Sequence, residues 1–121
     1  MLLDWTTGPL AEGLSCYQKQ EFFDAHEHWE AVWLKCEEPE KTFLQSLIQV
    51  TAAFHHLKRG NLAGTASLLR RALRRLDDFP AEYQGVAVNN LRASICGWLE
   101  ALGMGDALLQ LTPPAYPVIS G

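Results

Sequence analysis

The sequence has few cysteines, and they follow no pattern. Cys16, Cys36 and Cys96 are far apart, odd in number and without a CxxC spacing. Disulfide frameworks and cysteine-based metal sites need regular spacings of this residue. We therefore expect reduced thiols in small core or boundary positions, in a cytoplasmic protein.

The sequence also lacks a long hydrophobic run. Its longest uncharged stretch, residues 42–57, is shorter than the roughly 18 residues that span a membrane, and it contains Gln45, Gln49, His55 and His56. The N-terminal residues lack the basic region and apolar run of a secretory signal. These absences predict no membrane partner and no export.

Positive charge is scarce, since ten Lys and Arg residues face fourteen Asp and Glu residues and the net charge is -4. This balance gives no reason to expect a nucleic-acid partner. Four arginines do gather at positions 70, 71, 74 and 75. Because they lie in the C-terminal half of an amphipathic helix, where the helix dipole favours cations, we expect a solvated face there.

The 121 residues suffice for a single domain, residues 1–121, with a core of its own and no disulfide or structural metal. Apolar residues at helical spacing predict helices over about 8–19, 21–36, 42–59, 62–77 and 90–103. A short piece is expected around residues 106–111, followed by an extended, proline-rich tail over about 112–121. The predicted fold is an all-α, compact antiparallel bundle of five to six helices.

Three features predict how these helices begin and pack. Thr6 and Thr7 offer hydroxyls to cap the first helix, and Asn89 or Asn90 can cap the last. Gly60 is expected to end the third helix in a left-handed conformation beside a capping Asn61, which makes the third and fourth helices antiparallel neighbours. The third helix is apolar on more than one side, so we expect it at the centre of the bundle.

The second predicted helix carries ionisable groups among aromatic residues. His26, Glu30 and Trp33 stand at i, i+4 and i+7, with Phe22 and Trp29 flanking them. Glu27 points elsewhere on this helical wheel. A histidine and a carboxylate enclosed by aromatic rings are costly to bury unless each has a partner, so we expect the fold to supply one.

Partners for this pair are expected from the third helix. Gln45, Gln49 and His56 form a narrow polar row between its apolar stripes. We therefore predict a partly buried cluster of His26, Glu30, Gln49 and His56, with Trp33 and Gln45 as further ligand-binding candidates.

The ordered motifs resemble the domain-of-unknown-function family numbered 309. They are HxxxExxW at residues 26–33, the FLQxxIQ run at 43–49, His56, and the Gly60-Asn61 turn followed by Gly64. The resemblance spans about residues 13–76, with Ser46 standing where the family leads us to expect glycine. It implies a small all-helical bundle and a candidate site, but not an activity.

Several functions fit the cluster. It can be structural, fixing how two helices dock. It can bind a small polar ligand. It can also bind a metal through His26 and Glu30, but zinc needs three or four ligands, so His56 or Glu27 would have to complete the set. It can also act as a catalytic His-Glu general base, although no nucleophile is evident.

A different class is a protein interaction module that offers a helical groove or the tail to a partner. We also expect homo-oligomers, because a domain this small leaves apolar surface uncovered.

Overall fold

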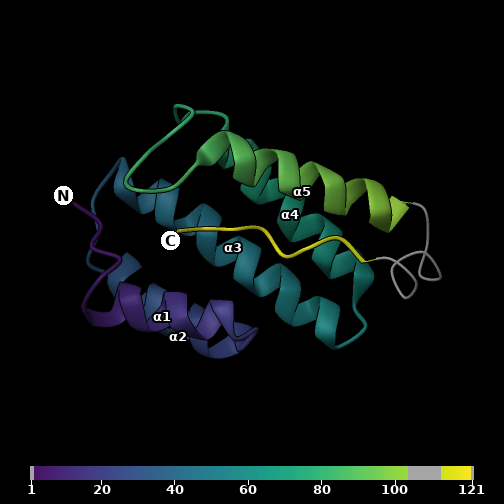
Figure 1. Ribbon diagram of the computed structural model, residues 1–121, viewed down its shortest axis with the longest axis horizontal. Coiled ribbons are helices and arrows are strands. Elements are labelled where there is room, and N and C mark those ends of the chain that lie inside the picture. Colours follow the sequence, from purple (N-terminus) through teal and green to yellow (C-terminus); the bar gives the residue numbers. More distant parts are fainter. Residues whose placement is uncertain (1, 104–112, 121) are drawn as a thin grey trace.

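The computed structural model describes residues 2–103 and 113–120, which contain five α-helices and no β-strand. The helices are α1 (Gly8–Gln18), α2 (Phe22–Trp33), α3 (Glu40–Lys58), α4 (Leu62–Leu76) and α5 (Val88–Gly103). Each helix packs on the next along the chain (Figure 1). The predicted all-helical, bundle-like fold is confirmed. The piece expected around residues 106–111 lies outside the described residues.

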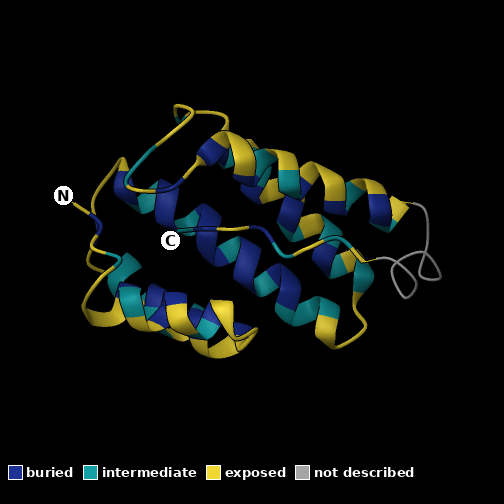
Figure 2. Cartoon of the chain, viewed as in Figure 1, coloured by how far each residue is buried: buried dark blue, intermediate teal, exposed yellow. Residues whose placement is uncertain are grey.

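Helix α3 runs between the α1–α2 pair and the α4–α5 pair (Figure 1). Phe43 and Leu47 are buried on one side of it, and Leu44 and Ile48 are buried about 100° further round the helix. Figure 2 shows the resulting band of buried residues along α3. Helices α2 and α4 pack directly on α3, and α1 and α5 pack on α2 and α4.

The helix limits differ from the predicted ones where local bonds intervene. Helix α2 ends at Trp33 rather than Cys36, because the amide of Cys36 bonds to the carbonyl of Trp33 in a tight turn. Helix α3 starts at Glu40, before the predicted Thr42, and the Glu38 carboxylate accepts a 2.7 Å bond from the Thr42 amide. This side chain satisfies one of the unpaired amides of the first turn.

The predicted caps of the first and last helices are wrong. The Thr7 hydroxyl donates to Asp4 at 2.7 Å instead of capping α1, and bonds from Thr6 and Thr7 lower the pKa of Asp4 to about 2. Helix α5 already begins at Val88, so Asn89 lies inside its first turn. At the first helix the hydroxyl has another partner, and at the last helix the asparagines lie within the helix.

The turn between α3 and α4 is as predicted. Gly60 has a φ of +78°, the left-handed region that favours glycine, and Asn61 accepts a 3.0 Å bond from the amide of Gly64. Helices α3 and α4 therefore run in opposite directions as neighbours (Figure 1).

Residues 113–120 are extended and cross the bundle (Figure 1). The ring of Tyr116 stacks on Trp98, with 5.6 Å between centroids, and lies 4.9 Å from the ring of Phe54. The Trp98 indole donates to the carbonyl of Ala115, and the Tyr17 hydroxyl donates to that of Pro117. The tail segment thereby connects α1, α3 and α5.

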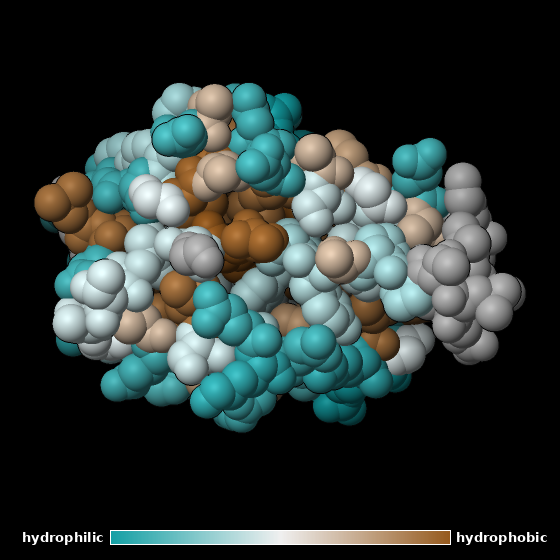
Figure 3. Space-filling view, viewed as in Figure 1, coloured by the Kyte–Doolittle hydropathy of each residue, from teal (hydrophilic) through white to brown (hydrophobic). Residues whose placement is uncertain are grey.

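The surface is mixed, with hydrophobic residues visible along the middle of the face in Figure 3 and hydrophilic residues along its long edges. Large exposed hydrophobic residues are Leu2, Phe23, Leu34 and Val118. Within the described part of the chain, no helix combines the length and apolar character needed to cross a membrane.

The cysteines are free thiols, and their positions correct one expectation. Cys36 is buried and Cys16 is half-buried, but Cys96 is exposed on α5. The buried stripe of α5 passes through Leu91, Ile95 and Trp98, so position 96 turns away from it.

Candidate functional site

The buried face of α2 is not the one that contains the predicted site. Phe22, Ala25 and Trp29 form its buried stripe. His26 and Glu30 stand one residue further on, about 100° round the helix, and their side chains remain 29% and 45% exposed. Both groups therefore lie half-buried at the boundary between the bundle and solvent.

Trp29 sets this rotation of α2. Its side chain is fully buried, its indole donates a 3.0 Å bond to the carbonyl of Leu10 in α1, and its ring stacks on Tyr17. Gly13 leaves room for the indole, since a Cβ there would lie 2.3 Å from its nitrogen. With Trp29 fixed against α1, the following position, Glu30, must turn toward solvent.

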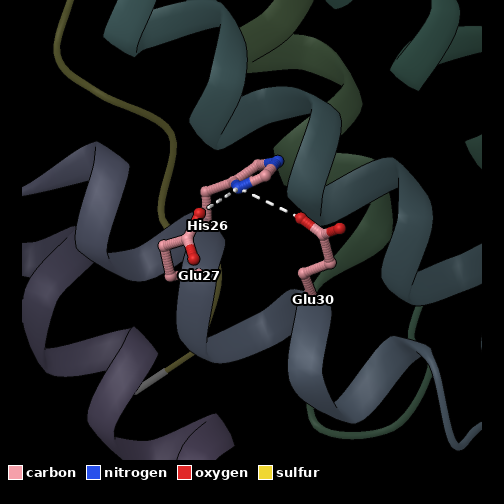
Figure 4. A group of neighbouring side chains, drawn as sticks. All are labelled: His26, Glu27 and Glu30. Carbon is pink, nitrogen blue, oxygen red and sulfur yellow. Dashed lines mark ion pairs between the residues drawn. The ribbon is translucent and has the colours of Figure 1, made fainter.

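Three side chains of α2 form a compact cluster (Figure 4). Nδ1 of His26 lies 3.5 Å from a carboxylate oxygen of Glu30 and 3.8 Å from one of Glu27, whose side chain is 60% exposed. Both carboxylates turn toward the same ring nitrogen in Figure 4. The cluster therefore presents one imidazole nitrogen and two carboxylates to a single region of solvent.

This donor set can hold a divalent metal. One ligand atom from each residue lies within 4.8 Å of the others. Nitrogen and oxygen ligands bind zinc at about 2.1 Å, which places tetrahedral ligands about 3.4 Å apart. The two distances from His26 are close to that separation, and the carboxylate oxygens of Glu27 and Glu30 lie within 4.8 Å of each other, so side-chain rotation is needed to bring all three atoms onto one ion.

The expected partners from α3 have other contacts. Gln49 accepts a 3.2 Å bond from Nε of Arg75 in α4, and Nδ1 of His56 lies 3.1 Å from the side-chain amide of Asn61. Among residues 2–103 and 113–120, no hydrogen bond or ion pair joins Gln49 or His56 to His26 or Glu30. The predicted four-residue cluster is not assembled.

The remaining candidates lie beside the cluster rather than in it. Gln45 is half-buried on α3. The Trp33 ring is half-buried under the ammonium of Lys41, 4.5 Å from the ring centroid, and its indole nitrogen has no hydrogen-bond partner among the described residues. Trp33 thus packs at the end of α2 and contributes no donor toward His26.

The sequence pattern did not place two residues, Glu27 and His55, near His26. Glu27 was placed on another face, yet its flexible side chain reaches the imidazole. His55 of α3 packs on Phe23, and its pKa is lowered by burial, with smaller contributions from the charges of Arg59, His56 and His26. The position of Glu27 next to His26 in the sequence was the available signal for its role. The proximity of His55 could not be predicted without knowing how α2 docks on α3.

The residues around α3 do not favour a nucleophilic mechanism. The hydroxyls of Ser46 and Thr51 are buried and donate to the carbonyls of Phe43 and Ile48 in their own helix. Burial raises the pKa of the Cys36 thiol, which disfavours the reactive thiolate. These three groups are therefore structural.

A second His–Glu pair offers a built-in comparison. Nδ1 of His28 lies 3.4 Å from a carboxylate oxygen of Glu12 in α1, and both side chains are exposed. The distance between these two groups is close to the 3.5 Å between His26 and Glu30. Within the described chain, however, no third donor joins the His28–Glu12 pair. It separates the effect of one ion pair from that of a three-donor cluster.

Comparison with known proteins agrees with the resemblance read from the motifs. An uncharacterized protein of Aquifex aeolicus (strain VF5) is 31% identical over 86 residues, which cover 69% of this chain. The chain spans only about a quarter of that relative, 26% of its length. Residues 10–68, which include His26, Glu27 and Glu30, match the family model of the domain of unknown function DUF309. This segment of the chain belongs to the DUF309 family.

Proposed function

We propose that His26, Glu27 and Glu30 bind a divalent metal ion on the solvent side of α2. The observation that carries the proposal is the convergence of three donor atoms within 4.8 Å. Imidazole and carboxylate ligands together suit first-row ions such as Zn²⁺ and Mn²⁺. Three protein ligands would leave the other coordination positions to water or to a small polar ligand.

The exposure of the cluster favours a metal over an organic ligand bound directly. An organic ligand of appreciable size needs walls that bury most of its surface. The cluster lies on one helix, and its side chains are 29% to 60% exposed. A metal ion needs donor atoms rather than walls, so an open site is sufficient for it.

The test is a thermal-shift titration with Zn²⁺ and Mn²⁺. We expect a metal-dependent rise in melting temperature for the wild type, because an ion that binds only the folded state stabilises it. Glu30→Gln and His26→Ala should abolish that rise. His28→Ala, which removes the histidine of the two-donor pair, should keep it. An equal rise in wild type and Glu30→Gln, or no rise at all, would remove the proposal.

Acidification provides a second readout. A protonated imidazole has no lone pair for a metal, so metal binding should weaken as the pH is lowered. Glu27→Gln should weaken binding as Glu30→Gln does, since both remove one carboxylate. Binding that is unchanged by Glu27→Gln would mean that the ion uses other ligands.

We further propose that the protein is cytoplasmic and forms a single domain built around a central apolar helix, with an extended C-terminal tail. We also propose that the protein self-associates. The proposal of self-association is motivated by Phe23 and Leu34, whose side chains are 56% and 65% exposed at the two ends of the α2 region. Light scattering coupled to size exclusion would test it: a dimer in wild type that dissociates in Phe23→Ser is expected, and a wild-type monomer would contradict it.

A further inference from the structure

Three arginines of α4 line one hollow of the surface. Arg71, Arg74 and Arg75 surround it together with Thr42 of α3 and Asp78, and its volume is about 290 Å³. Positions 71, 74 and 75 are spaced i, i+3 and i+4, so they share one side of the helix. The helix dipole accounts for arginines near the end of α4, but not for their convergence on a hollow.

These guanidinium groups form no direct ion pair among the described residues, but Glu38 lies nearby: its pKa is lowered mainly by bonds from Thr42 and in smaller part by the charges of Lys41 and Arg75. In the described part of the chain, the arginine that pairs with a carboxylate is Arg92, with Asp77. Arg71, Arg74 and Arg75 have no carboxylate oxygen within 4.0 Å among residues 2–103 and 113–120. The lining itself therefore carries three guanidiniums and one carboxylate, and the carboxylate of Glu38, which is bonded to Thr42, lowers the local positive charge further.

One arginine is held in place by a neutral group. Nε of Arg75 donates a 3.2 Å bond to the side-chain oxygen of Gln49, which lies half-buried on α3. This bond fixes the plane of the guanidinium without cancelling its charge, and it leaves the terminal nitrogens as donors. Planar, oriented guanidiniums are suited to bidentate recognition of phosphate.

We propose that the hollow lined by Arg71, Arg74 and Arg75 binds the phosphoryl group of a small molecule. A hollow of about 290 Å³ has room for a diphosphate group, and a single-stranded oligonucleotide is the competing ligand in the test. The whole chain carries a net charge of -4, so attraction for an anion has to be local to this hollow. The site is separate from the cluster on α2, and its three arginines follow residues 10–68 that match the family, whereas Thr42 and Gln49 lie within that segment.

The experiment is calorimetric titration of the full chain with inorganic pyrophosphate and, separately, inorganic phosphate at an ionic strength of about 0.15 M. Arg74→Gln should weaken pyrophosphate binding about tenfold, as expected for the loss of one charge-assisted contact. Arg70→Gln removes the same charge from the same helix but not from the lining of the hollow. Because solvent and salt screen surface charges that do not touch the ligand, this variant should change the affinity less than about twofold.

A third variant should change the pyrophosphate affinity in the opposite direction. Asp78→Asn removes the one carboxylate of the lining, so it should strengthen pyrophosphate binding, which loss of folding cannot do. Equal weakening by Arg74→Gln and Arg70→Gln would show non-specific attraction to the helix and overturn the proposal. No heat of binding in the wild type at millimolar pyrophosphate would also overturn it, as would tighter binding of a single-stranded oligonucleotide than of pyrophosphate.

Discussion

Gly13→Ala should destabilise the protein, although alanine is the better helix former. A Cβ at position 13 would lie 2.3 Å from the indole nitrogen and 2.5 Å from Cδ1 of Trp29. The indole cannot retreat freely, because it is fully buried and donates to the carbonyl of Leu10. Either α1 shifts away from α2, or the indole turns and its hydrogen bond is lost.

The magnitude follows from three opposing contributions. Overpacking a core costs about 1 to 3 kcal/mol, and a buried donor left without its partner costs about 1 to 3 kcal/mol. Replacing a helical glycine by alanine returns about 1 kcal/mol. Because only part of the hydrogen-bond cost is expected if α1 shifts, we predict a net loss of about 2 kcal/mol.

Urea denaturation followed by tryptophan fluorescence measures this loss. With an m-value of about 2 kcal/mol/M, the midpoint should fall by about 1 M. Gly97→Ala is the matched control, since Gly97 lies in α5 with no atom near its added Cβ, and it should raise stability by about 0.5 to 1 kcal/mol. A Gly13→Ala protein as stable as Gly97→Ala would refute the close packing of α1 on Trp29.

Three further substitutions test separate parts of the structure. His26→Ala should change the free energy of unfolding by less than about 0.5 kcal/mol without metal, because partly exposed ion pairs contribute little; a loss above 2 kcal/mol in urea would mean that the residue is a core group. Asn61→Ala removes the cap of α4 and should cost about 1 kcal/mol, and an unchanged midpoint would refute the cap. Tyr83→Phe removes the 2.6 Å bond to Glu40, the main cause of that carboxyl's lowered pKa. The stability this bond adds is present at neutral pH and is lost as the pH falls through the lowered folded-state pKa of Glu40. Wild type and Tyr83→Phe should therefore differ at pH 7, and the difference should shrink as the pH is lowered; a constant difference would contradict this.

The existence and order of the helices could be predicted because their signals are local. Apolar spacing located all five helices, and Gly60 with Asn61 located the turn between α3 and α4. Helix ends were less predictable, since the Glu38 carboxylate and the tight turn at Cys36 decide them through side-chain and backbone bonds that periodicity does not encode.

The site was harder to predict, because the rotation of a helix depends on its neighbours. Phe22 and Trp29 are compatible with two buried stripes, one through His26 and one through Ala25. The half-buried Trp33 favours the first on the helical wheel. The bond between Trp29 and α1 selects the second, which moves His26 to the boundary.

The partners of polar groups were unpredictable for a related reason. Gln49 and His56 lie on the same side of α3, and a helical wheel does not show whether that side faces α2 or α4. Arg75 and Asn61, both on the α4 side, form the contacts that the structure has. A helical wheel shows which residues share a face, but the docking of the next helix decides which partner that face meets.

The most direct test of the metal site is an anomalous difference map from crystals grown with Zn²⁺. We expect one strong peak about 2.1 Å from Nδ1 of His26 and from a carboxylate oxygen of each of Glu27 and Glu30. A peak at the His28–Glu12 pair instead, or a map with no peak beside His26, would contradict a three-donor metal site on α2.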